Sequence, residues 1–424
     1  MNEKNVIVGL DVGTTKVCTI VGIQNPTETG SEIEVLSIGT HPSQGLKKGS
    51  VVNIDKTVSS IRASAEDAKL TAGINFARAT IGIAGSHIYS FNSTGVVAIK
   101  GTEITQSDVD RVIDAAKAVV ILSDREILHV IPQEFKVDTI SGIRNPIGMR
   151  GVRLEARVHI VTGSVALIQN LIKCVEQSGI QVEHITLQPI ASSEAVLTTE
   201  EKDMGVCLVD IGGGTTDLAV WKDGSLIHSQ IIPVGGNHFT NDLAVALKIS
   251  HQEAERVKIH HGSVLAEELN QSAHISVQGL PGTKPREVAL STVAKVLGAR
   301  AEELFDIIKQ QVEEKGLSEE ITGGFVLTGG GAMIKGLPEL GDYILSRPTK
   351  IGYPNSFGGM TRIMQDPKYS TVLGLLLESS KINPIDHTIS HQTQKQSGRD
   401  FQMPQMDLIG KLSDSLKSVF KDIF

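Results

Sequence analysis

The most restrictive feature of this 424-residue sequence is a strand, a glycine-rich turn and a second strand that occur twice. The first copy carries DVGTTK at residues 11–16, and the second carries DIGGGTTD at residues 210–217. Apolar, β-rich runs flank both turns, and Asp210 follows Asp11 by 199 positions. An internal repeat of this kind predicts two similar α/β halves.

The chemistry of these turns predicts a bound nucleoside triphosphate. Glycine has no Cβ, so backbone N–H groups can converge on an anion, and Thr hydroxyls add donors. An Asp at the strand end can face phosphate only when a divalent cation or its water shell lies between them. Two such turns that face each other would clamp ATP-type phosphates and Mg²⁺, although each turn taken alone also fits a simple hairpin.

A third glycine-rich motif, VLTGGGA at residues 326–332, ends a predicted strand with three glycines. Glycines at that place let a flat base pack against the backbone. Between the two turns, residues 86–161 interrupt the repeated order and are interpreted as an insertion, in which Thr105 opens a helix with a capping box.

Composition excludes several classes of protein. The net charge of −8 and the 4% aromatic content disfavour nucleic acid as a partner. The three cysteines lie far apart, which is typical of reduced thiols and not of a disulfide frame or a zinc site. The N-terminus has no signal-peptide pattern, and no apolar run reaches the ~18 residues of a membrane span. We therefore expect a cytoplasmic protein whose membrane contact is peripheral.

In this order, the three motifs resemble the phosphate-1, phosphate-2 and adenosine segments of the actin, heat-shock-chaperone and sugar-kinase superfamily. The strings LDVGTTKV, LVDIGGGTTDLAVW, VGGNHFT, EAERVKIHHG and VLTGGGAMIKGLPEL resemble the FtsA family of bacterial actin-like division proteins. The resemblance covers roughly residues 5–380 and the helical tail. It implies a duplicated actin-like (ribonuclease-H-like) α/β fold around a nucleotide cleft, with an inserted α+β subdomain and a C-terminal amphipathic helix.

The resemblance also implies a division of the chain. Residues 1–85 with 162–190 would form the first core half, and residues 191–235 with 326–380 the second. The remaining parts would be a polymer-contact subdomain at 86–161, a smaller subdomain at 236–325, a linker at 381–405 and a membrane-targeting helix at 406–424.

Roles for particular residues follow from the same resemblance. ATP would be held by the two turns, by a ribose-contacting Glu-x-x-Lys pair and by the third motif; the residues are Asp11, Gly13, Thr14, Thr15, Lys16, Asp210, Gly212, Gly213, Gly214, Thr215, Thr216, Gly236, Glu255, Lys258, Gly329, Gly330 and Gly331. Asp11 and Asp210 would meet Mg²⁺ through water. Glu255 and Lys258 lie one helical turn apart, so a solvated ion pair is the alternative interpretation.

Gln188 lies in the segment that links the two halves, where related ATPases carry a Gln or Glu that orients the attacking water. A Gln can position water but cannot deprotonate it, so slow or absent ATP hydrolysis is expected. A polar hinge contact is the alternative role for Gln188.

The last residues, 406–424, recover helical periodicity after a polar linker. On a helical wheel the apolar side chains gather on one face, and the predicted membrane contacts are Leu408, Ile409, Leu412, Leu416, Val419, Phe420, Ile423 and Phe424. Surface binding to lipid is the favoured interpretation, and packing on the protein's own core or on a partner is the alternative.

The leading functional hypothesis is an ATP-dependent membrane adaptor that forms filaments, binds the C-terminal peptide of FtsZ and helps recruit later division proteins to the septum. The resemblance, not the motifs, supplies these partners. Arg300 in the smaller subdomain is the candidate for the peptide carboxylate, and a surface Arg without a partner is the alternative. A sugar kinase or a peptide-binding chaperone of the same superfamily remains the competing class.

Overall fold

The computed structural model describes residues 5–27, 30–267, 272–280, 282, 284–355, 357–359 and 366–381. Contacts group the chain up to Lys381 into one unit. The predicted linker beyond Lys381 and the predicted helix at 406–424 lie outside the described residues and stay predictions.

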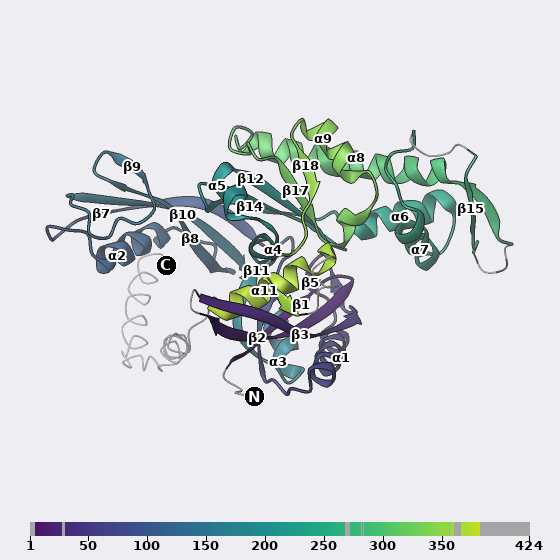
Figure 1. Ribbon diagram of the computed structural model, residues 1–424, viewed down its shortest axis with the longest axis horizontal. Helices are drawn as coiled ribbons and strands as arrows, with labels where there is room; N and C mark the ends of the chain where they lie inside the picture. Colours follow the sequence, from purple (N-terminus) through teal and green to yellow (C-terminus); the bar gives the residue numbers. More distant parts are fainter. Residues whose placement is uncertain are drawn as a thin grey trace, which may run out of the picture. The chain divides into compact units, whose positions relative to one another are not determined.

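The first half is built on a six-stranded sheet (Figure 1). Its strands, in spatial order, are β11 (Gln181–Leu187), β6 (Arg78–Ile83), β1 (Val6–Val12), β2 (Lys16–Thr27), β3 (Gly30–Pro42) and β19 (Gly358–Gly359). β1, β2 and β3 form an antiparallel meander, whereas β6 runs parallel to β1 and β11 parallel to β6.

The second half repeats this arrangement in a five-stranded sheet. Its strands, in the corresponding order, are β18 (Thr349–Ile351), β17 (Phe325–Thr328), β12 (Val206–Ile211), β13 (Thr216–Lys222) and β14 (Ser225–Ile232). Again three strands form an antiparallel meander and two run parallel to its first strand. The duplication predicted from the two glycine-rich turns is confirmed by this equal strand order.

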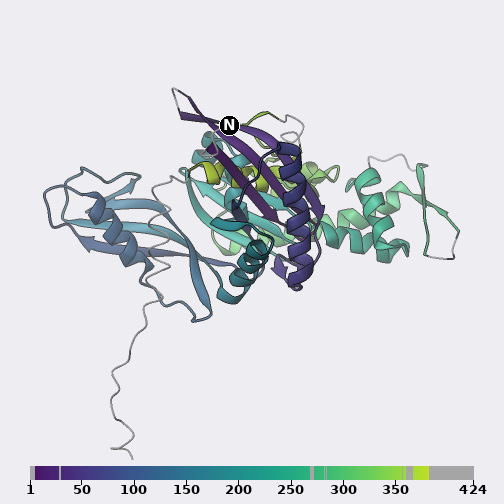
Figure 2. The ribbon, with the colours of Figure 1, turned by 90° about the horizontal axis from the view of Figure 1, so that it is seen from below.

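Helices cover both faces of the first sheet because β1 is apolar on both sides. Val8 and Leu10 pack with Ile61 of α1 (Ile54–Ala72), whereas Ile7 packs with Val372 of α11 (Ser370–Lys381). Such alternation follows from the two-residue period of a strand. Figure 2 shows α1 lying across the strands of this sheet. α3 (Val165–Gln177) packs beside α1.

α1 forms where apolar residues recur at helical spacing. Val58, Ile61, Ala65 and Ala68 are buried, and full burial of a Val or Ile side chain stabilises by ~1.5–3 kcal/mol. The side chain of Asn53 caps the helix by accepting the Lys56 N–H at 3.0 Å.

Two short helices begin the second half. α4 (Gln188–Val196) leaves the end of β11 and packs on α11, and α5 (Thr199–Met204) follows it before β12. Because α4 connects the two sheets, its position is set by both halves.

The smaller subdomain of the second half is mainly helical. It contains α6 (Gly236–Leu247), α7 (His251–His261), α8 (Leu290–Glu314) and a hairpin of β15 (His274–Val277) and β16 (Arg286–Ala289). Phe239, Leu243 and Phe305 are fully buried where α6 and α8 meet. The remaining elements are β4 (Leu46–Lys47), β5 (Ser50–Val51), η2 (Gly330–Met333), α9 (Leu337–Leu345) and η3 (Pro367–Tyr369).

The inserted subdomain, residues 86–161, forms its own sheet with one helix (Figure 1). The strands, in spatial order, are β7 (Tyr89–Ala98), β10 (Arg153–Ser164), β8 (Arg125–Val137) and β9 (Ile140–Ile143), and α2 (Gln106–Lys117) packs on β7 and β10. The predicted capping box is present, because the Thr105 N–H donates to Asp108 at 3.0 Å.

Although the inserted subdomain interrupts the sequence of the first half, it also forms hydrogen bonds with β14 of the second half. The Ser90 hydroxyl donates to the Ser229 carbonyl at 2.6 Å, and the Gln133 amide donates to the Leu226 carbonyl at 3.1 Å. The buried His159 contacts the Ser229 hydroxyl at 3.0 Å. The inserted subdomain therefore bridges both halves on one side.

All three cysteines, Cys18, Cys174 and Cys207, are buried and free. In the described part of the chain, no helix is long and apolar enough to cross a membrane.

Candidate nucleotide-binding site

The two glycine-rich turns have the same backbone hydrogen bond. In the first turn the Gly13 N–H donates to the Lys16 carbonyl at 3.0 Å, and in the second the Gly212 N–H donates to the Thr215 carbonyl at 2.9 Å. Each turn closes a hairpin whose first strand has an Asp one residue before its end, so Asp11 and Asp210 occupy equivalent positions.

The two turns face each other at close range. A Cβ on Gly213 would lie 2.2 Å from Cγ2 of Thr15, and a Cβ on Gly214 would lie 2.6 Å from Oγ1 of Thr14. Any larger residue would push the turns apart, which explains why the second turn needs glycine at these two positions.

Between the turns lies a cavity of about 570 Å³, here named the central cavity. Nearly every predicted nucleotide residue lines it: Asp11, Gly13, Thr14, Thr15, Lys16, Asp210, Gly212, Gly213, Gly214, Thr215, Gly236, Glu255, Lys258, Gly329, Gly330 and Gly331. Gln188 lines it as well. Thr216 does not, because it lies within β13 and its hydroxyl donates to the Val234 carbonyl at 2.8 Å.

The third motif lies directly beside the second turn. Gly329 has a φ of +83°, and a Cβ there would lie 2.3 Å from Oδ1 of Asp210. A Cβ on Gly331 would lie 2.4 Å from Cγ2 of Ile211. Both glycines are thus required for β17 to turn into η2 next to the carboxylate. Beyond η2, the helix α9 begins at Leu337.

Burial dominates the electrostatics of the two carboxylates. Burial raises the pKa of Asp11 to about 6, against the lowering effect of Lys16 and with a further raising effect of Asp210. Burial also raises the pKa of Asp210, although hydrogen bonds from Ser192 and Thr371 oppose it. A nearby cation would relieve this penalty, because it favours the ionised form.

Asp217 is a third carboxylate at the central cavity, and the sequence interpretation missed it. It pairs with Asp210 across the β12–β13 hairpin, where the first half has Cys18 opposite Asp11. Burial, followed by the Asp210 carboxylate, raises the pKa of Asp217 well above its usual range. Its Oδ1 is buried and lacks a hydrogen-bond partner among the described residues.

The arrangement fits a divalent cation held through water. No group of three or more His, Cys, Asp and Glu side chains in the described ranges is placed to coordinate a metal ion directly. The three buried carboxylates nevertheless repel one another. Hydrated Mg²⁺ near them would relieve this repulsion, since it keeps several water ligands in most protein sites.

The predicted Glu-x-x-Lys pair forms an ion pair at the edge of the central cavity, and the ribose contact stays a prediction. Nζ of Lys258 lies 2.8 Å from the Glu255 carboxylate, so the two form a helical ion pair on α7. Lys258 also donates to the Gly236 carbonyl at 3.0 Å and to the Thr240 hydroxyl at 2.8 Å. Both side chains line the central cavity.

α4 contacts the carboxylates of both turns. The Gln188 amide donates to Oδ1 of Asp11 at 2.8 Å, and the Ser192 hydroxyl donates to Oδ2 of Asp210 at 2.6 Å. Thr371 of α11 donates to the same oxygen of Asp210 at 3.1 Å. Ser192 and Thr371 were not predicted, because a lone hydroxyl on a helix gives no sequence signal.

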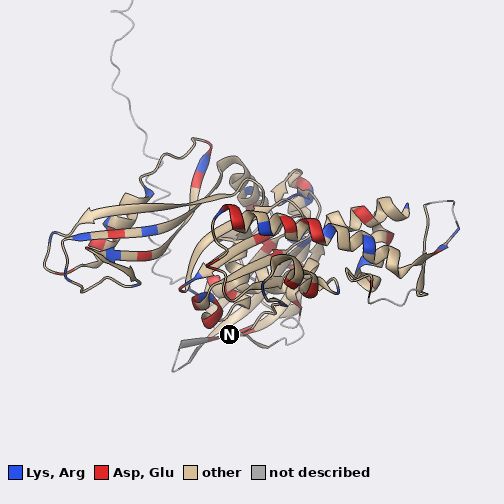
Figure 3. Ribbon diagram, turned by 90° about the horizontal axis from the view of Figure 1, so that it is seen from above, with Lys and Arg blue, Asp and Glu red and all other residues tan. Residues whose placement is uncertain are grey.

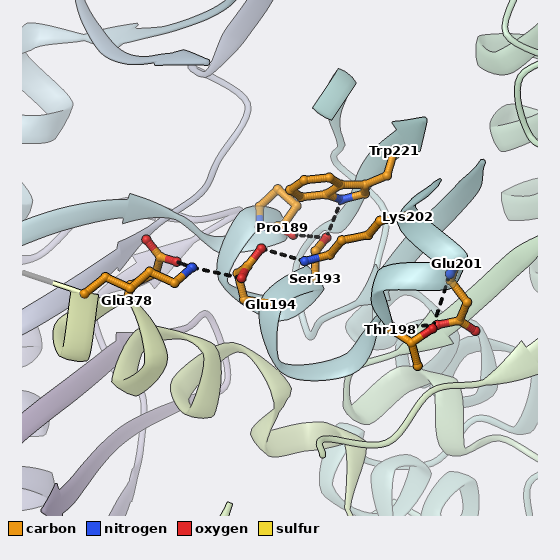
Figure 4. Close-up of polar contacts among 9 residues, drawn as sticks. Pro189, Ser193, Glu194, Thr198, Glu201, Lys202, Trp221 and Glu378 are labelled. Atoms are coloured by element: carbon orange, nitrogen blue, oxygen red, sulfur yellow. Dashed lines mark hydrogen bonds and ion pairs between the residues drawn. The ribbon is translucent and has the colours of Figure 1, made fainter. Parts of the chain in front are cut away.

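Other residues of α4 join a polar network shown in Figure 4. The Ser193 hydroxyl accepts the indole N–H of Trp221 at 2.9 Å. The Glu194 carboxylate lies 2.6 Å from Nζ of Lys202 and 2.9 Å from Nζ of Lys381. Lys381 is the last described residue of α11, so α4 is tied to the end of the folded unit.

Lys16 reaches from the first turn towards the second half. Its ammonium donates to the Lys368 carbonyl and lies 4.3 Å from the ring centre of Tyr369. Lys368 also lines the central cavity and was not predicted, because no motif surrounds it in the sequence.

Arg300 lies outside the central cavity and already has partners. Its guanidinium donates to both carboxylate oxygens of Asp242, at 2.5 and 3.1 Å, and to Glu303. Figure 3 shows acidic and basic residues interspersed along the helices on this side, α8 among them. The expectation that a carboxylate partner binds Arg300 therefore requires that partner to displace Asp242.

Comparison with known families assigns most of the described chain. The model of the cell division protein FtsA matches residues 207–374, and the model of the SHS2 domain inserted in FtsA matches residues 85–162. The chain is 44% identical to cell division protein FtsA of Pseudomonas aeruginosa over 371 residues, which cover 88% of each chain. It is 42% identical to that of Borreliella burgdorferi over 402 residues, which cover 93% of this chain and 96% of the relative.

Solved structures share the fold at low sequence identity. A PilM-PilN type IV pilus biogenesis complex matches with a TM-score of 0.65 at 15% identity, covering 88% of this chain and 98% of that one. MreB5 of Spiroplasma citri bound to ADP matches with a TM-score of 0.53 at 17% identity, covering 92% and 99%. The predicted actin-like fold is confirmed by these neighbours.

Proposed function

The chain belongs to the FtsA family of cell division proteins, and from this premise we propose that it is an ATP-binding, filament-forming adaptor that anchors FtsZ to the membrane. Its site of action is the cytoplasmic face of the cell membrane at the division septum. The observation that carries the ATP-binding part is the central cavity, closed on two sides by matching turns that each present a buried Asp.

ATP with Mg²⁺ is the ligand that this chemistry favours. The turns offer backbone N–H groups and Thr hydroxyls to phosphate, and the carboxylates of Asp11, Asp210 and Asp217 favour a hydrated divalent cation between them and the phosphates. MreB5, which shares the fold, was solved with ADP, and this supports a nucleotide at the equivalent place. Glu255 and Lys258 would contact the ribose, and the glycines at 329–331 would border the adenine.

Gln188 is proposed to position a water molecule rather than to act as a base. Its amide already orients Oδ1 of Asp11, so it also acts on the Mg²⁺ side of the cavity. Because an amide has no useful basicity, ATP turnover should be slow or absent.

Calorimetric titration with ATP and Mg²⁺ tests the site. Asp210→Ala removes one of the carboxylates and should weaken binding at least tenfold, about 1.4 kcal/mol. Asp203→Ala is a matched control, because Asp203 forms a half-exposed ion pair with Arg144 remote from the lining residues. Equal affinity in wild type and Asp210→Ala would remove the carboxylate from the site.

The inserted subdomain is proposed to supply polymer contacts. Deletion of residues 86–161 with rejoined flanks should abolish filaments seen by electron microscopy on lipid with ATP. Filaments that persist in this variant would assign the subdomain another role.

Binding of the FtsZ C-terminal peptide is proposed for the smaller subdomain, residues 236–325. Arg300→Glu breaks the bidentate pair with Asp242 and should lower peptide affinity in a fluorescence-anisotropy titration. Asp242→Asn is informative beside it, because it leaves Arg300 only the Glu303 carboxylate and should raise affinity when the peptide carboxylate competes with Asp242. Unchanged affinity in both variants would exclude Arg300.

Membrane anchoring is proposed for residues 406–424. This segment carries three Lys and three Asp, so apolar burial rather than charge should drive lipid binding. Leu416→Glu with Phe420→Glu should abolish liposome co-sedimentation, whereas a rise from about 0.1 to 0.5 M salt should reduce wild-type binding only modestly. Full release by salt, with the double variant still bound, would contradict this account.

A sugar-kinase-like function is the competing proposal. This proposal predicts that a sugar raises ATP turnover, and the turnover of the same protein can be measured with and without a sugar. Lipid-dependent assembly without any sugar effect favours the adaptor.

A further inference from the structure

One backbone amide links the inserted subdomain to the segment that carries Gln188. β11 is the edge strand of the first sheet, so amides on its outer side have no strand partner in that sheet. The Leu187 N–H at the end of β11 donates instead to Nε2 of His129, at 3.0 Å. His129 belongs to β8 of the inserted subdomain.

The His129 ring is held as an acceptor. Burial, followed by the charge of the neighbouring His184, lowers the pKa of His129 to about 4. At neutral pH the ring is therefore uncharged, and Nε2 keeps the lone pair that the Leu187 N–H requires.

The residue after Leu187 is Gln188, whose side chain lies over Gly82 of β6. A Cβ at Gly82 would lie only 3.0 Å from Cγ of Gln188, so glycine leaves the room that this side chain occupies. Its amide donates to Asp11 at 2.8 Å, and this contact depends on where the backbone at residues 187–188 lies. That backbone is what His129 holds.

We propose that His129 is a positioning residue of the nucleotide site: through the Leu187 amide it sets Gln188 against Asp11 and so couples the inserted subdomain to Mg²⁺-ATP binding. The inference rests on the proposed function, because it needs ATP in the central cavity. It assigns to the inserted subdomain an effect on nucleotide affinity in addition to polymer contacts.

Two polar substitutions of nearly equal size separate positioning from packing. In His129→Gln the side-chain oxygen can reach about the place of Nε2, whereas in His129→Asn it is one bond too short. His129→Asn should weaken Mg²⁺-ATP binding about threefold to tenfold, as expected for one lost hydrogen bond, and His129→Gln should stay within about twofold of wild type. Calorimetry on the full chain measures both.

A double-mutant cycle tests whether His129 acts through Gln188. Gln188→Ala alone should also weaken binding, and adding His129→Asn to it should cause no further loss, because the positioned group is gone. Additive losses would show that His129 acts by another route, and equal affinities of His129→Asn and wild type would overturn the proposal.

His159→Asn is the matched control for general loosening of the subdomain. His159 is a buried histidine of the same inserted sheet, but it contacts Ser229 of β14 and not the β11–α4 junction. Its substitution should leave Mg²⁺-ATP affinity unchanged, and a loss equal to that of His129→Asn would overturn specific positioning. A wild-type protein that binds no Mg²⁺-ATP would overturn the proposed function itself, whereas wild-type binding with unaffected His129 variants would overturn only this inference.

Discussion

Asp217 is a buried carboxylate whose ionisation is opposed by a second carboxylate beside it. It is buried beside Asp210 and has an unpaired carboxylate oxygen. A buried carboxylate whose pKa is raised destabilises the folded state at neutral pH, because ionisation is easier in the unfolded chain. The side chain that causes this loss of stability lines the central cavity.

Asp217→Asn should therefore separate stability from ligand binding. The neutral amide keeps the shape and removes one charge from the cluster, so the melting temperature without nucleotide should rise by roughly 2 °C. The further rise on adding Mg²⁺-ATP should be smaller than in wild type, because a cation contact is lost. A thermal-shift series with and without ligand measures both quantities. A ligand-induced rise in melting temperature that is equal to or larger than that of wild type would contradict the assignment.

His159 predicts a pH dependence of stability with the opposite sign to that of the carboxylates. Burial, followed by His228 and His129, lowers the pKa of His159 from 6.5 to about 3. Below pH 6.5 the unfolded chain binds a proton that the folded state does not, so stability is lost as the pH falls towards 3.

His159→Gln should make the unfolding free energy less dependent on pH within this window. Urea unfolding at several pH values compares the two proteins, and the raised pKa values of Asp11, Asp210 and Asp217 contribute equally to both. Parallel curves for wild type and variant would show that His159 does not titrate as described.

The sequence located the cavity residues that belong to local patterns and missed those that do not. Glycine-rich turns are short, so the motifs that hold Thr14, Gly213 and Gly329 are visible in the sequence, and the family resemblance supplied their roles. Lys368 and Thr371 come to the cavity, and Ser192 comes to Asp210, through tertiary packing, for which a single sequence gives no periodicity. For Arg300 the sequence shows the positive charge, but it does not show that Asp242 pairs with that charge in the folded protein.

At the scale of elements, three glycines let a helix approach its neighbour at backbone distance. A Cβ on Gly39 of β3 would lie 2.1 Å from the Ser64 carbonyl of α1, and one on Gly95 of β7 would lie 2.1 Å from the Val112 carbonyl of α2. On α11, a Cβ on Gly374 would lie 1.8 Å from the Ala191 carbonyl of α4.

Gly374→Ala should loosen the contact between α11 and α4. The added methyl group meets backbone atoms that cannot rotate away, so the cost should be about 1–3 kcal/mol of unfolding free energy. In Gly101→Ala, the control, the nearest atom to the new Cβ is 3.5 Å away and the change should stay within about 0.5 kcal/mol. Equal urea midpoints for the two variants would contradict the close packing.

Periodicity in a sequence indicates where helices and strands form. It does not indicate the close glycine contacts described above. Val58, Ile61 and Ala65 recur at helical spacing, which indicates α1 and its buried face. That Gly39 lies under this helix depends on which strand the helix crosses, and this is decided by the whole sheet.

At the scale of the whole molecule, the duplication determines where the site lies. Equal strand order in the two sheets places both Asp-bearing turns at the same sheet position, and their contact forms the central cavity. The repeat in the sequence predicted this. The hydrogen bonds from the inserted subdomain to β14 were not predictable, because they join segments that no motif relates.

The three buried thiols can serve as probes of local opening in the folded unit. Cys18 lies in β2, Cys174 in α3 and Cys207 in β12, so each marks a different region. Burial raises the pKa of Cys18 to about 12 and also raises that of Cys207, so both react with a thiol reagent only when their surroundings open. Mass-spectrometric labelling should be slow at all three sites in the native protein and fast in urea.

Mg²⁺-ATP should slow labelling at Cys18 and Cys207 most, since these residues lie on strands that carry the two turns, and should affect Cys174 least. Equal slowing at all three would show that the protein opens as one body. Unequal slowing would give, for each half separately, the rate at which the structure around its cysteine opens while nucleotide is bound.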